Sequence, residues 1–308
     1  MKAGIVGLPN VGKSTLFNCL SNTKAQSANF PFCTIEPNHS IINVPDKRLM
    51  TLEDIVKPEK VIPATVEIVD IAGLVKGASK GEGLGNKFLA NIRETDAIIH
   101  VLRCFDNDNI THVDGSVDPV RDKEIIDIEL QLKDLESLNN RIEKVNRTAK
   151  SGDKDALREK EILQKAIAFI ESSNNIRSID LEIADINKYL KPLQLITSKP
   201  VLYVCNVDEN SINSKNDYVE SVKSLISKED ANLIVLAAGI ESEINELDDY
   251  EERRMFLDDL GLDVPGSSKL INATYDLLNL QTYFTAGPKE VRAWTIQKMA
   301  TAPQAAGV

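Results

Sequence analysis

One nine-residue segment near the N-terminus constrains the fold of this chain more than any other: Gly7-Leu8-Pro9-Asn10-Val11-Gly12-Lys13-Ser14-Thr15. It fits the pattern G-x-x-x-x-G-K-[ST], in which a glycine-rich loop wraps around phosphate groups. Residues 2–6 before it are typical of a short buried strand, and residues 15–20 after it are typical of a helix. A strand, this loop and a helix in that order form a P-loop, which predicts a nucleotide-binding α/β fold.

The P-loop residues have separate roles in such a site. Gly7 and Gly12 let the backbone curl so that its N–H groups point inward, where the helix N-terminus adds partial positive charge. The ammonium group of Lys13 can reach the β- and γ-phosphates, and the hydroxyl of Ser14 can bind Mg²⁺. We therefore expect Lys13 to neutralise charge in the transition state and Ser14 to be a metal ligand.

Two later segments match the parts of a nucleotide switch. Thr34 lies in a loop between Pro31 and Pro37, where a switch protein places a threonine that gives Mg²⁺ a second hydroxyl. Asp70 ends a β-branched run and begins a D-x-x-G pattern that closes at Gly73. We expect Asp70 to hold the Mg²⁺ shell and the N–H of Gly73 to approach the γ-phosphate. An ordinary turn residue remains the alternative for Thr34.

The motifs do not identify the residue that handles the attacking water. Leu74 follows Gly73 directly, where Ras-like GTPases carry a glutamine, and a leucine cannot orient water. His112 lies on a polar loop just after the buried strand at residues 96–104, on the side where ligands of α/β proteins bind. It is a candidate catalytic residue, and a surface histidine without a catalytic role is the alternative.

A second motif bears on the identity of the base. Residues 206–209, Asn-Val-Asp-Glu, follow a buried strand at the place where a GTPase carries N-K-x-D, whose aspartate bonds N1 and N2 of guanine. Val207 replaces the lysine, and Glu209 replaces the aspartate with a side chain one methylene longer. The pattern predicts that guanine selectivity is damaged and that Glu209 points away from the base, while Asn206 keeps the first residue of the motif and is a candidate for nucleotide binding. Ala238, in a later Ala-Ala-Gly sequence, can pass beneath a purine.

Composition and charge limit the number of domains and the kinds of partner that we expect. The chain of 308 residues is long enough for two domains, and no apolar run approaches the length of a membrane span. The net charge of −11 argues against a chain coated in nucleic acid. Residues 206–263 hold 16 acidic against 5 basic residues, so the acidity is regional and other surfaces can meet an anionic partner.

Two features of the sequence indicate its compartment. Met1 leads straight into the first strand, so we expect no signal peptide. The four cysteines are far apart and form no C-x-x-C pair, which is typical of reduced thiols and excludes an evident zinc site or disulfide framework. We therefore expect a cytoplasmic protein.

Between residues 120 and 198 the hydrophobic period becomes helical, with apolar residues three and four apart. A Ser-Gly-Asp break at residues 151–153 divides the run, which predicts an antiparallel helical hairpin, a coiled-coil insertion in the α/β domain. Five basic residues stand near its turn on roughly one helical face: Arg141, Lys144, Arg147, Lys150 and Lys154. A solvated charged face and an RNA-binding tip are the two explanations left open.

Together these motifs and the C-terminal segments resemble the YchF/Obg-like ATPase family, a branch of the Obg-related P-loop proteins. The segments that carry the resemblance are residues 7–15, 29–38, 70–85, 206–209, 280–287 and 302–307. The likeness covers essentially the whole chain. It implies a doubly wound Obg-type G domain over residues 1–278, with the helical insertion at 120–198 inside it, and the start of a β-rich TGS domain at 279–308.

The short C-terminal part departs from the family pattern. About 30 residues are too few for an independent core. Three explanations stay open: the polypeptide is truncated, the tail packs on the ATPase domain, or the tail is disordered. Any function of the TGS face is therefore uncertain.

The resemblance also implies an activity and the residues that carry it. Members of the family bind ATP in preference to GTP, hydrolyse it slowly to ADP, and associate with ribosomes in translation and stress responses. By this likeness Ser14 and Thr34 bind Mg²⁺, Val207 lies against adenine, and His112 activates water. Asn10 matches an asparagine that coordinates K⁺ in potassium-stimulated relatives. The phosphate-binding residues implied by the likeness are Asn10, Val11, Gly12, Lys13, Ser14 and Thr15.

The sequence thus predicts a monomeric Mg²⁺-dependent ATPase that binds ribosomes and has neither a membrane nor sequence-specific DNA as a partner. Two other functions stay open. A non-catalytic ATP sensor is favoured by Leu74, and an Obg-type GTPase is what the D-x-x-G pattern alone indicates.

Overall fold

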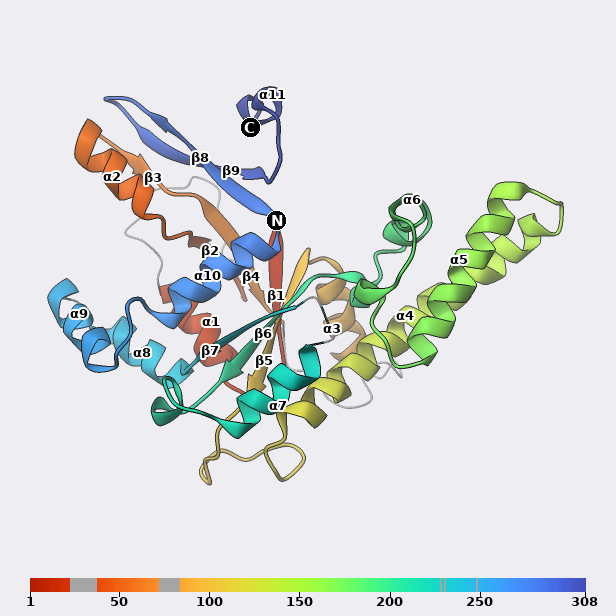
Figure 1. Cartoon of the computed structure of the whole chain (residues 1–308), viewed down its shortest axis with the longest axis horizontal. Helices are drawn as coiled ribbons and strands as arrows, with labels where there is room; N and C mark the ends of the chain where they lie inside the picture. The colour runs from red at the N-terminus through yellow and green to blue at the C-terminus, as the bar shows by residue number, and fades with distance from the viewer. Residues whose placement is uncertain (23–37, 72–83, 228, 230, 248) are drawn as a thin grey trace.

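The P-loop follows a central strand of a six-stranded sheet in the computed structural model, which describes residues 1–22, 38–71, 84–227, 229, 231–247 and 249–308 (Figure 1). The strand order is β2-β4-β1-β5-β6-β7, and every neighbouring pair is parallel except β2 with β4. The strands are β1 (Lys2–Val6), β2 (His39–Asn43), β4 (Thr65–Asp70), β5 (Ala97–Arg103), β6 (Val201–Asn206) and β7 (Asn232–Leu236).

The position of β1 explains where the site forms. The chain continues from β1 to β2 and β4 on one side, and then to β5, β6 and β7 on the other, so the strand order reverses beside β1. Ligands of open α/β sheets bind at such a reversal, outside the carboxyl ends of the strands. Strands β5 and β6 are buried along their whole length, as expected for parallel strands covered on both faces.

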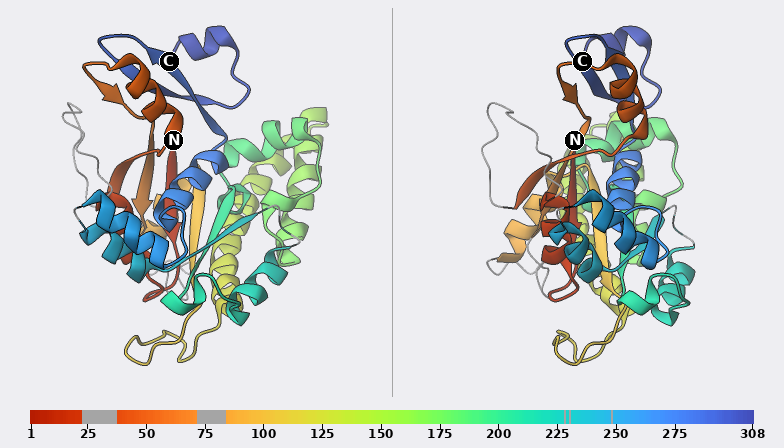
Figure 2. Two further views of the ribbon diagram at one scale, coloured as in Figure 1. Left: turned by 60° about the vertical axis from the view of Figure 1, so that its left-hand side comes forward. Right: turned by 90° about the vertical axis from the view of Figure 1, so that its left-hand side faces the viewer.

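Two groups of helices flank the sheet (Figures 1 and 2). Helices α1, α8 and α10 lie together beside it, whereas α4 contacts α7 and β5. The helices of the domain are α1 (Lys13–Asn22), α3 (Leu84–Arg93), α7 (Asp217–Ile226), α8 (Ala238–Glu246), α9 (Tyr250–Asp259) and α10 (Gly266–Leu277). The architecture confirms the predicted doubly wound α/β fold. No helix in the described ranges is both long enough and apolar enough to cross a membrane.

A helical hairpin projects from the sheet as a separate arm, built from α4 (Pro119–Ala149) and α5 (Lys154–Glu171) (Figure 1). Asp118 and Asp153 cap the two helices by accepting from backbone N–H groups. The arm has a hydrophobic core of its own, which includes Leu138, Ile162 and Leu163. Short helical turns return the chain to β6: η2 (Ile176–Ser178), α6 (Ile183–Asp185), η3 (Ile186–Leu190), η4 (Lys191–Leu193) and η5 (Ile196–Ser198).

The C-terminal residues form a second, smaller sheet with the order β3-β9-β8. Strands β8 (Leu280–Ala286) and β9 (Val291–Gln297) make an antiparallel hairpin, and β9 also pairs in parallel with β3 (Val61–Ile62). Helix α2 (Lys47–Val56) packs on this sheet, where the Arg48 guanidinium lies 5.0 Å from the Phe284 ring centre. The described tail, which ends with α11 (Ala302–Ala306), thus packs on segments that precede β4 in the sequence.

Candidate nucleotide-binding site

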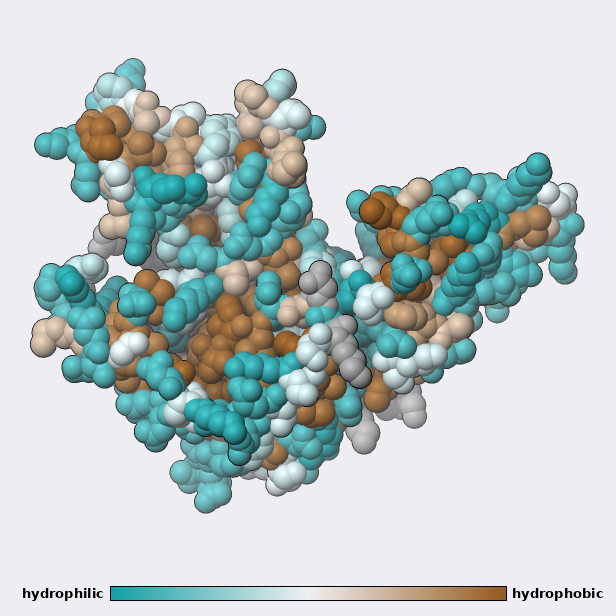
Figure 3. Space-filling model, in the orientation of Figure 1, coloured by the Kyte–Doolittle hydropathy of each residue, from teal (hydrophilic) through white to brown (hydrophobic). Residues whose placement is uncertain are grey.

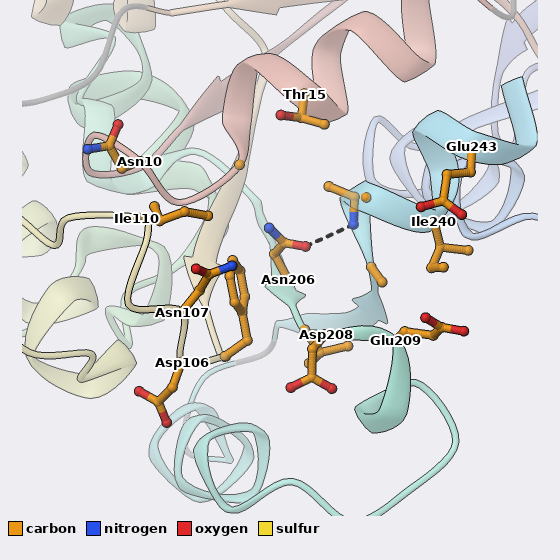
Figure 4. A pocket seen from close by; sticks show the side chains of 16 residues that line it. Asn10, Thr15, Asp106, Asn107, Ile110, Asn206, Asp208, Glu209, Ile240 and Glu243 are labelled. Atoms are coloured by element: carbon orange, nitrogen blue, oxygen red, sulfur yellow. Dashed lines mark hydrogen bonds between the residues drawn. The ribbon is translucent and has the colours of Figure 1, made fainter. Parts of the chain in front are cut away.

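A direct contact joins the P-loop to the end of β6. Asn206 donates from Nδ2 to the carbonyl of Val11 at 2.9 Å, and its Oδ1 accepts from the N–H of Ala238 at 2.9 Å (Figure 4). Gly12 has a φ of +96°, and a Cβ at this position would lie 2.3 Å from Nδ2 of Asn206. Only glycine fits there without displacing the amide, so Asn206 holds the P-loop and the start of α8 in one arrangement.

A cavity of about 500 Å³ opens beside this contact (Figure 4). It lies at the carboxyl ends of the parallel strands, and its volume is within the range of small-molecule sites. Six of the residues predicted from the sequence line it: Asn10, Gly12, Thr15, Asn206, Val207 and Ala238. The cavity therefore brings together the phosphate motif, the base motif and the start of α8.

The cavity also has a wall that the motifs do not reveal. Phe105, Asp106, Asn107 and Ile110 line it from the loop after β5, and Glu243 lines it from α8. The sequence places this loop on the ligand side, because it follows the carboxyl end of a buried strand. Without a phosphate or base motif in the loop, this position does not say which of its side chains face the ligand.

Glu209 lines the cavity (Figure 4). It begins a short 3-10 turn, η6 (Glu209–Ser211), in which the Asp208 carboxylate accepts from the Ser211 N–H at 2.9 Å. Asp208 and Glu209 therefore line the cavity together, after the end of β6. That Glu209 points away from the base stays a prediction.

A charged cluster occupies the phosphate end of the site. The Lys13 ammonium is buried, and its nearest acceptor in the described chain is the Leu8 carbonyl, at the long distance of 3.5 Å. Burial lowers the pKa of Lys13, and the charge of Asp70 opposes this shift. Burial raises the pKa of Asp70, which the Lys13 charge and a hydrogen bond from Ser14 oppose. The cluster thus places a cation, a carboxylate and a hydroxyl where a triphosphate and its metal would bind.

The donor set of this cluster fits Mg²⁺. Asp70 ends β4, next to β1, and its Oδ1 is buried without a hydrogen-bond partner among the described residues. The hydroxyl of Ser14 lies in the first turn of α1 and is the second oxygen ligand available. Carboxylate and hydroxyl oxygens are the ligands that Mg²⁺ prefers, together with waters and phosphate oxygens. Thr34 and Gly73, which the sequence adds to this site, lie outside the described residues.

His112 lies close to the cavity but does not line it. Its ring is buried, and Nε2 is 2.8 Å from Oδ2 of Asp122, in the first turn of α4. Its Nδ1 accepts the backbone N–H of Asp114 at 3.1 Å. Because that N–H can only donate, the ring proton lies on Nε2, and both nitrogens are engaged. The sequence missed Asp122, whose only signal is an acid near the start of the helix that follows the histidine.

Asn10 links the P-loop to the same loop. It has a φ of +62°, and its Nδ2 donates to the carbonyl of Thr111 at 3.1 Å. His112 follows Thr111 directly in the sequence. Asn10 thus lies at the rim of the cavity and contacts the loop that carries the candidate catalytic histidine.

Comparison with known proteins connects this geometry to a family. A family model described as "50S ribosome-binding GTPase" matches residues 2–144, and a model of the C-terminal region of YchF GTPases, described as a protein of unknown function, matches residues 280–308. The "Ribosome-binding ATPase YchF" of Pasteurella multocida is 55% identical over 307 residues, which are 100% of this chain and 84% of that protein. The protein of the same name from Bacillus subtilis is 53% identical over 310 residues, with the same coverage.

Solved structures agree with these matches. The YchF GTPase of Schizosaccharomyces pombe superposes with a TM-score of 0.89 at 38% identity, covering 100% of this chain and 83% of that one. A GTP binding protein from Pyrococcus horikoshii superposes with a TM-score of 0.60 at 19% identity, covering 100% of this chain and 89% of that one. The second likeness shows the fold alone.

Proposed function

Because the chain belongs to the YchF family of ribosome-binding ATPases, we propose that it binds ATP with Mg²⁺ in the cavity and hydrolyses it to ADP. This proposal rests on one observation: Asn206 forms hydrogen bonds with both the P-loop and the start of α8, beside a cavity of about 500 Å³. The phosphates would lie along Asn10 to Thr15, and the base would enter between the loop after β5 and the start of α8.

The phosphate end supplies the charges for hydrolysis. Ser14 and Asp70 would hold the metal, with Thr34 as a further ligand, and Mg²⁺ would neutralise charge on the β- and γ-phosphate oxygens. Among the described residues, Lys13 donates to a distant carbonyl, that of Leu8, which supports an ammonium group available to the phosphates. Its charge would stabilise the transition state, and the N–H of Gly73 would contact the γ-phosphate.

Two features support a preference for ATP. Val207 is buried and stands where a GTPase has the lysine whose stem covers guanine. Two relatives that are 53% and 55% identical to the chain are named as ATPases. However, Asp208 and Glu209 both line the cavity, and a carboxylate can accept from N1 and N2 of guanine as well as from N6 of adenine. An Obg-type GTPase is therefore the alternative, and the related Schizosaccharomyces pombe protein is called a YchF GTPase.

For water activation we propose His112 with Asp122 as its partner. A base needs a free nitrogen, so Nδ1 must first release the N–H of Asp114. Asp122 would then still hold the protonated Nε2 and orient the ring, as a carboxylate does in acid–base pairs. The contact between Asn10 and Thr111 offers a route by which nucleotide in the P-loop could move this loop, and K⁺ bound at Asn10 would act at the same place.

The partner we propose is the ribosome, as the names of the relatives state for those proteins. The outer end of the arm carries five exposed basic residues, a suitable surface for rRNA: Arg141, Lys144, Arg147, Lys150 and Lys154. We propose that the protein acts as a monomer in the cytoplasm, where ribosomes are, and that bound ATP sets its affinity for them.

Phosphate release from ATP tests the activity, with Mg²⁺ and K⁺ present and with or without ribosomes. Replacing His112 with alanine should lower kcat by about a hundredfold, the usual contribution of a general base, while ATP affinity stays unchanged. The control is His39→Ala, because His39 lies in β2, on the edge of the sheet. A wild-type rate in His112→Ala would remove the histidine from the mechanism.

The same assay distinguishes an enzyme that hydrolyses ATP from a non-catalytic ATP sensor. Replacing Lys13 with alanine should abolish phosphate release, because no other described cation lies at the phosphate end of the site. If wild type binds ATP but releases no phosphate, even with ribosomes and K⁺, the protein is a non-catalytic ATP sensor.

A further inference from the structure

The last residue of β5 is a buried arginine whose hydrogen bonds, among the described residues, go to backbone carbonyls of the loop after it. Arg103 is 1% exposed, although it is among the largest side chains of the chain. Its guanidinium donates from Nε to the carbonyl of Phe105 at 3.1 Å, from one terminal nitrogen to Ile110 at 2.9 Å, and from the other to Asn107 at 3.2 Å. The guanidinium carbon also lies 4.8 Å from the centre of the Phe105 ring.

This environment is unusual for a buried cation. Burying a charge is unfavourable unless the charge is paired, and buried arginines are commonly paired with carboxylates. Within the described ranges no carboxylate forms an ion pair with Arg103, and three carbonyls take its place. Because the guanidinium is planar and its donors are fixed in direction, the three carbonyls must converge on one plane. Arg103 therefore selects one conformation of residues 105–110.

The conformation selected in this way shapes the nucleotide site. Phe105, Asn107 and Ile110, the three residues whose carbonyls bind Arg103, also line the cavity (Figure 4). The chain then reaches Thr111, whose carbonyl accepts from Asn10 of the P-loop. One buried side chain thus sets the path of the loop from the end of β5 to the P-loop contact.

We propose that Arg103 is a positioning residue for the nucleotide reaction: it fixes the loop of residues 105–112 as a wall of the base cavity and sets the place of His112. Its guanidinium faces the backbone of this loop, so its effect on the reaction would pass through the loop. The inference rests on the proposed ATPase function for its effect on turnover, but its effect on the loop does not depend on any activity.

The test compares wild type with Arg103→Lys, which keeps the positive charge and loses the planar fork. The control is Arg48→Lys, because Arg48 also lies over an aromatic ring but is on α2, which packs on the small sheet. Hydrogen exchange without nucleotide should be at least about tenfold faster at the amides of Asn109 and Ile110 in Arg103→Lys, because both donate to Asn107, and unchanged in the sheet and in the control.

Nucleotide measurements complete the test. In Arg103→Lys the affinity for an ATP analogue should fall about tenfold, because the loop must be ordered on binding, and kcat should fall as well because His112 is displaced. A folded Arg103→Lys with wild-type exchange in the loop and wild-type ATP affinity would overturn the proposal. Faster exchange spread evenly over the domain would also overturn it, since Arg103 would then support the core alone.

A measurement on wild type keeps the proposal open to refutation if the variant does not fold. In wild type without nucleotide, the amides of Asn109 and Ile110 should be protected, because both donate to Asn107, whose carbonyl is held by Arg103. Exchange at the rate of a free loop would contradict it. If wild type shows this protection but no ATP binding, the ATPase proposal fails and the role of Arg103 in the loop stands.

Discussion

At the scale of single residues, the site combines motif residues that the sequence identifies with partners that it cannot identify. Gly12 and Asn206 belong to motifs, and their contact follows from the spacing of those motifs in a P-loop fold. Asp122 and Arg103 belong to no motif. Their roles depend on the turn of α4 that faces the loop and on the direction of the last side chain of β5, which only the packed structure defines.

His100 is a buried residue outside the reaction site whose chemistry predicts a pH effect on stability. It lies in β5 beside Tyr203, with ring centres 5.5 Å apart, and its Nε2 has no hydrogen-bond partner in the described part of the chain. Burial lowers the pKa of His100 to about 3, helped by the charges of Lys123 and Arg177 and opposed by that of Glu229. The imidazole is therefore neutral in the folded protein at all pH values above about 3.

The unfolded chain binds a proton at His100 near pH 6.5, whereas the folded chain does not. This contribution to stability is present above pH 6.5 and is lost as pH falls, by about 1.4 kcal/mol per pH unit. Urea unfolding at pH 7.5 and 5.5 should therefore show a smaller loss of stability in His100→Phe than in wild type. An equal loss in both proteins would show that His100 is protonated in the fold or is not the group responsible.

At the scale of elements, the sequence predicts the two helices of the arm but not the contacts that attach the arm to the sheet. The helical period and the break at residues 151–153 predict two helices, and α4 and α5 are found on either side of that break. The period does not reveal how the arm is fixed to the sheet. Asp134 of α4 accepts from the N–H groups of Ile196 and Thr197, at 2.8 and 2.7 Å, just before β6. Such contacts between distant segments have no periodic signature.

We predict that the basic residues at the outer end of the arm contribute to ribosome binding. Hydrophilic residues cover most of its outer end in Figure 3. Replacing Arg141, Lys144 and Arg147 by glutamate should weaken co-sedimentation with ribosomes and reduce its dependence on salt, because contacts to phosphates release counterions. ATP affinity should not change, since these residues lie near the outer turn of the arm, far along α4 from the site.

The control for this variant reverses three exposed lysines outside the arm, which gives the same change in net charge: Lys215, Lys269 and Lys289. If both variants lose ribosome binding equally, the effect is one of net charge alone. If neither loses it, the basic residues are a solvated face, and the arm tip is not the contact surface.

At the scale of the whole molecule, the P-loop with its strand and helix was sufficient to predict the α/β architecture, because that motif functions only in a strand–loop–helix context. The small sheet could not be predicted in the same way. It pairs β3 with β9, two strands that are far apart in the sequence, and no pattern in either one indicates its partner. The sequence predicts the motifs on two sides of the cavity and places the loop after β5 on the ligand side, but it does not identify the residues of that loop that line the cavity.

The residues that line the base cavity would determine whether the protein prefers ATP or GTP, the nucleotides of the two activities in the relatives' names. The P-loop and Asn206 would serve ATP and GTP alike, whereas Val207, Asp208 and Glu209 line the cavity where the proposal places the base. The direct test is equilibrium binding of fluorescent ATP and GTP analogues to the purified chain in the presence of Mg²⁺. We predict that ATP binds at least about tenfold tighter, a difference of about 1.4 kcal/mol. GTP binding that is equal or tighter would contradict this account and would identify the protein as a GTPase.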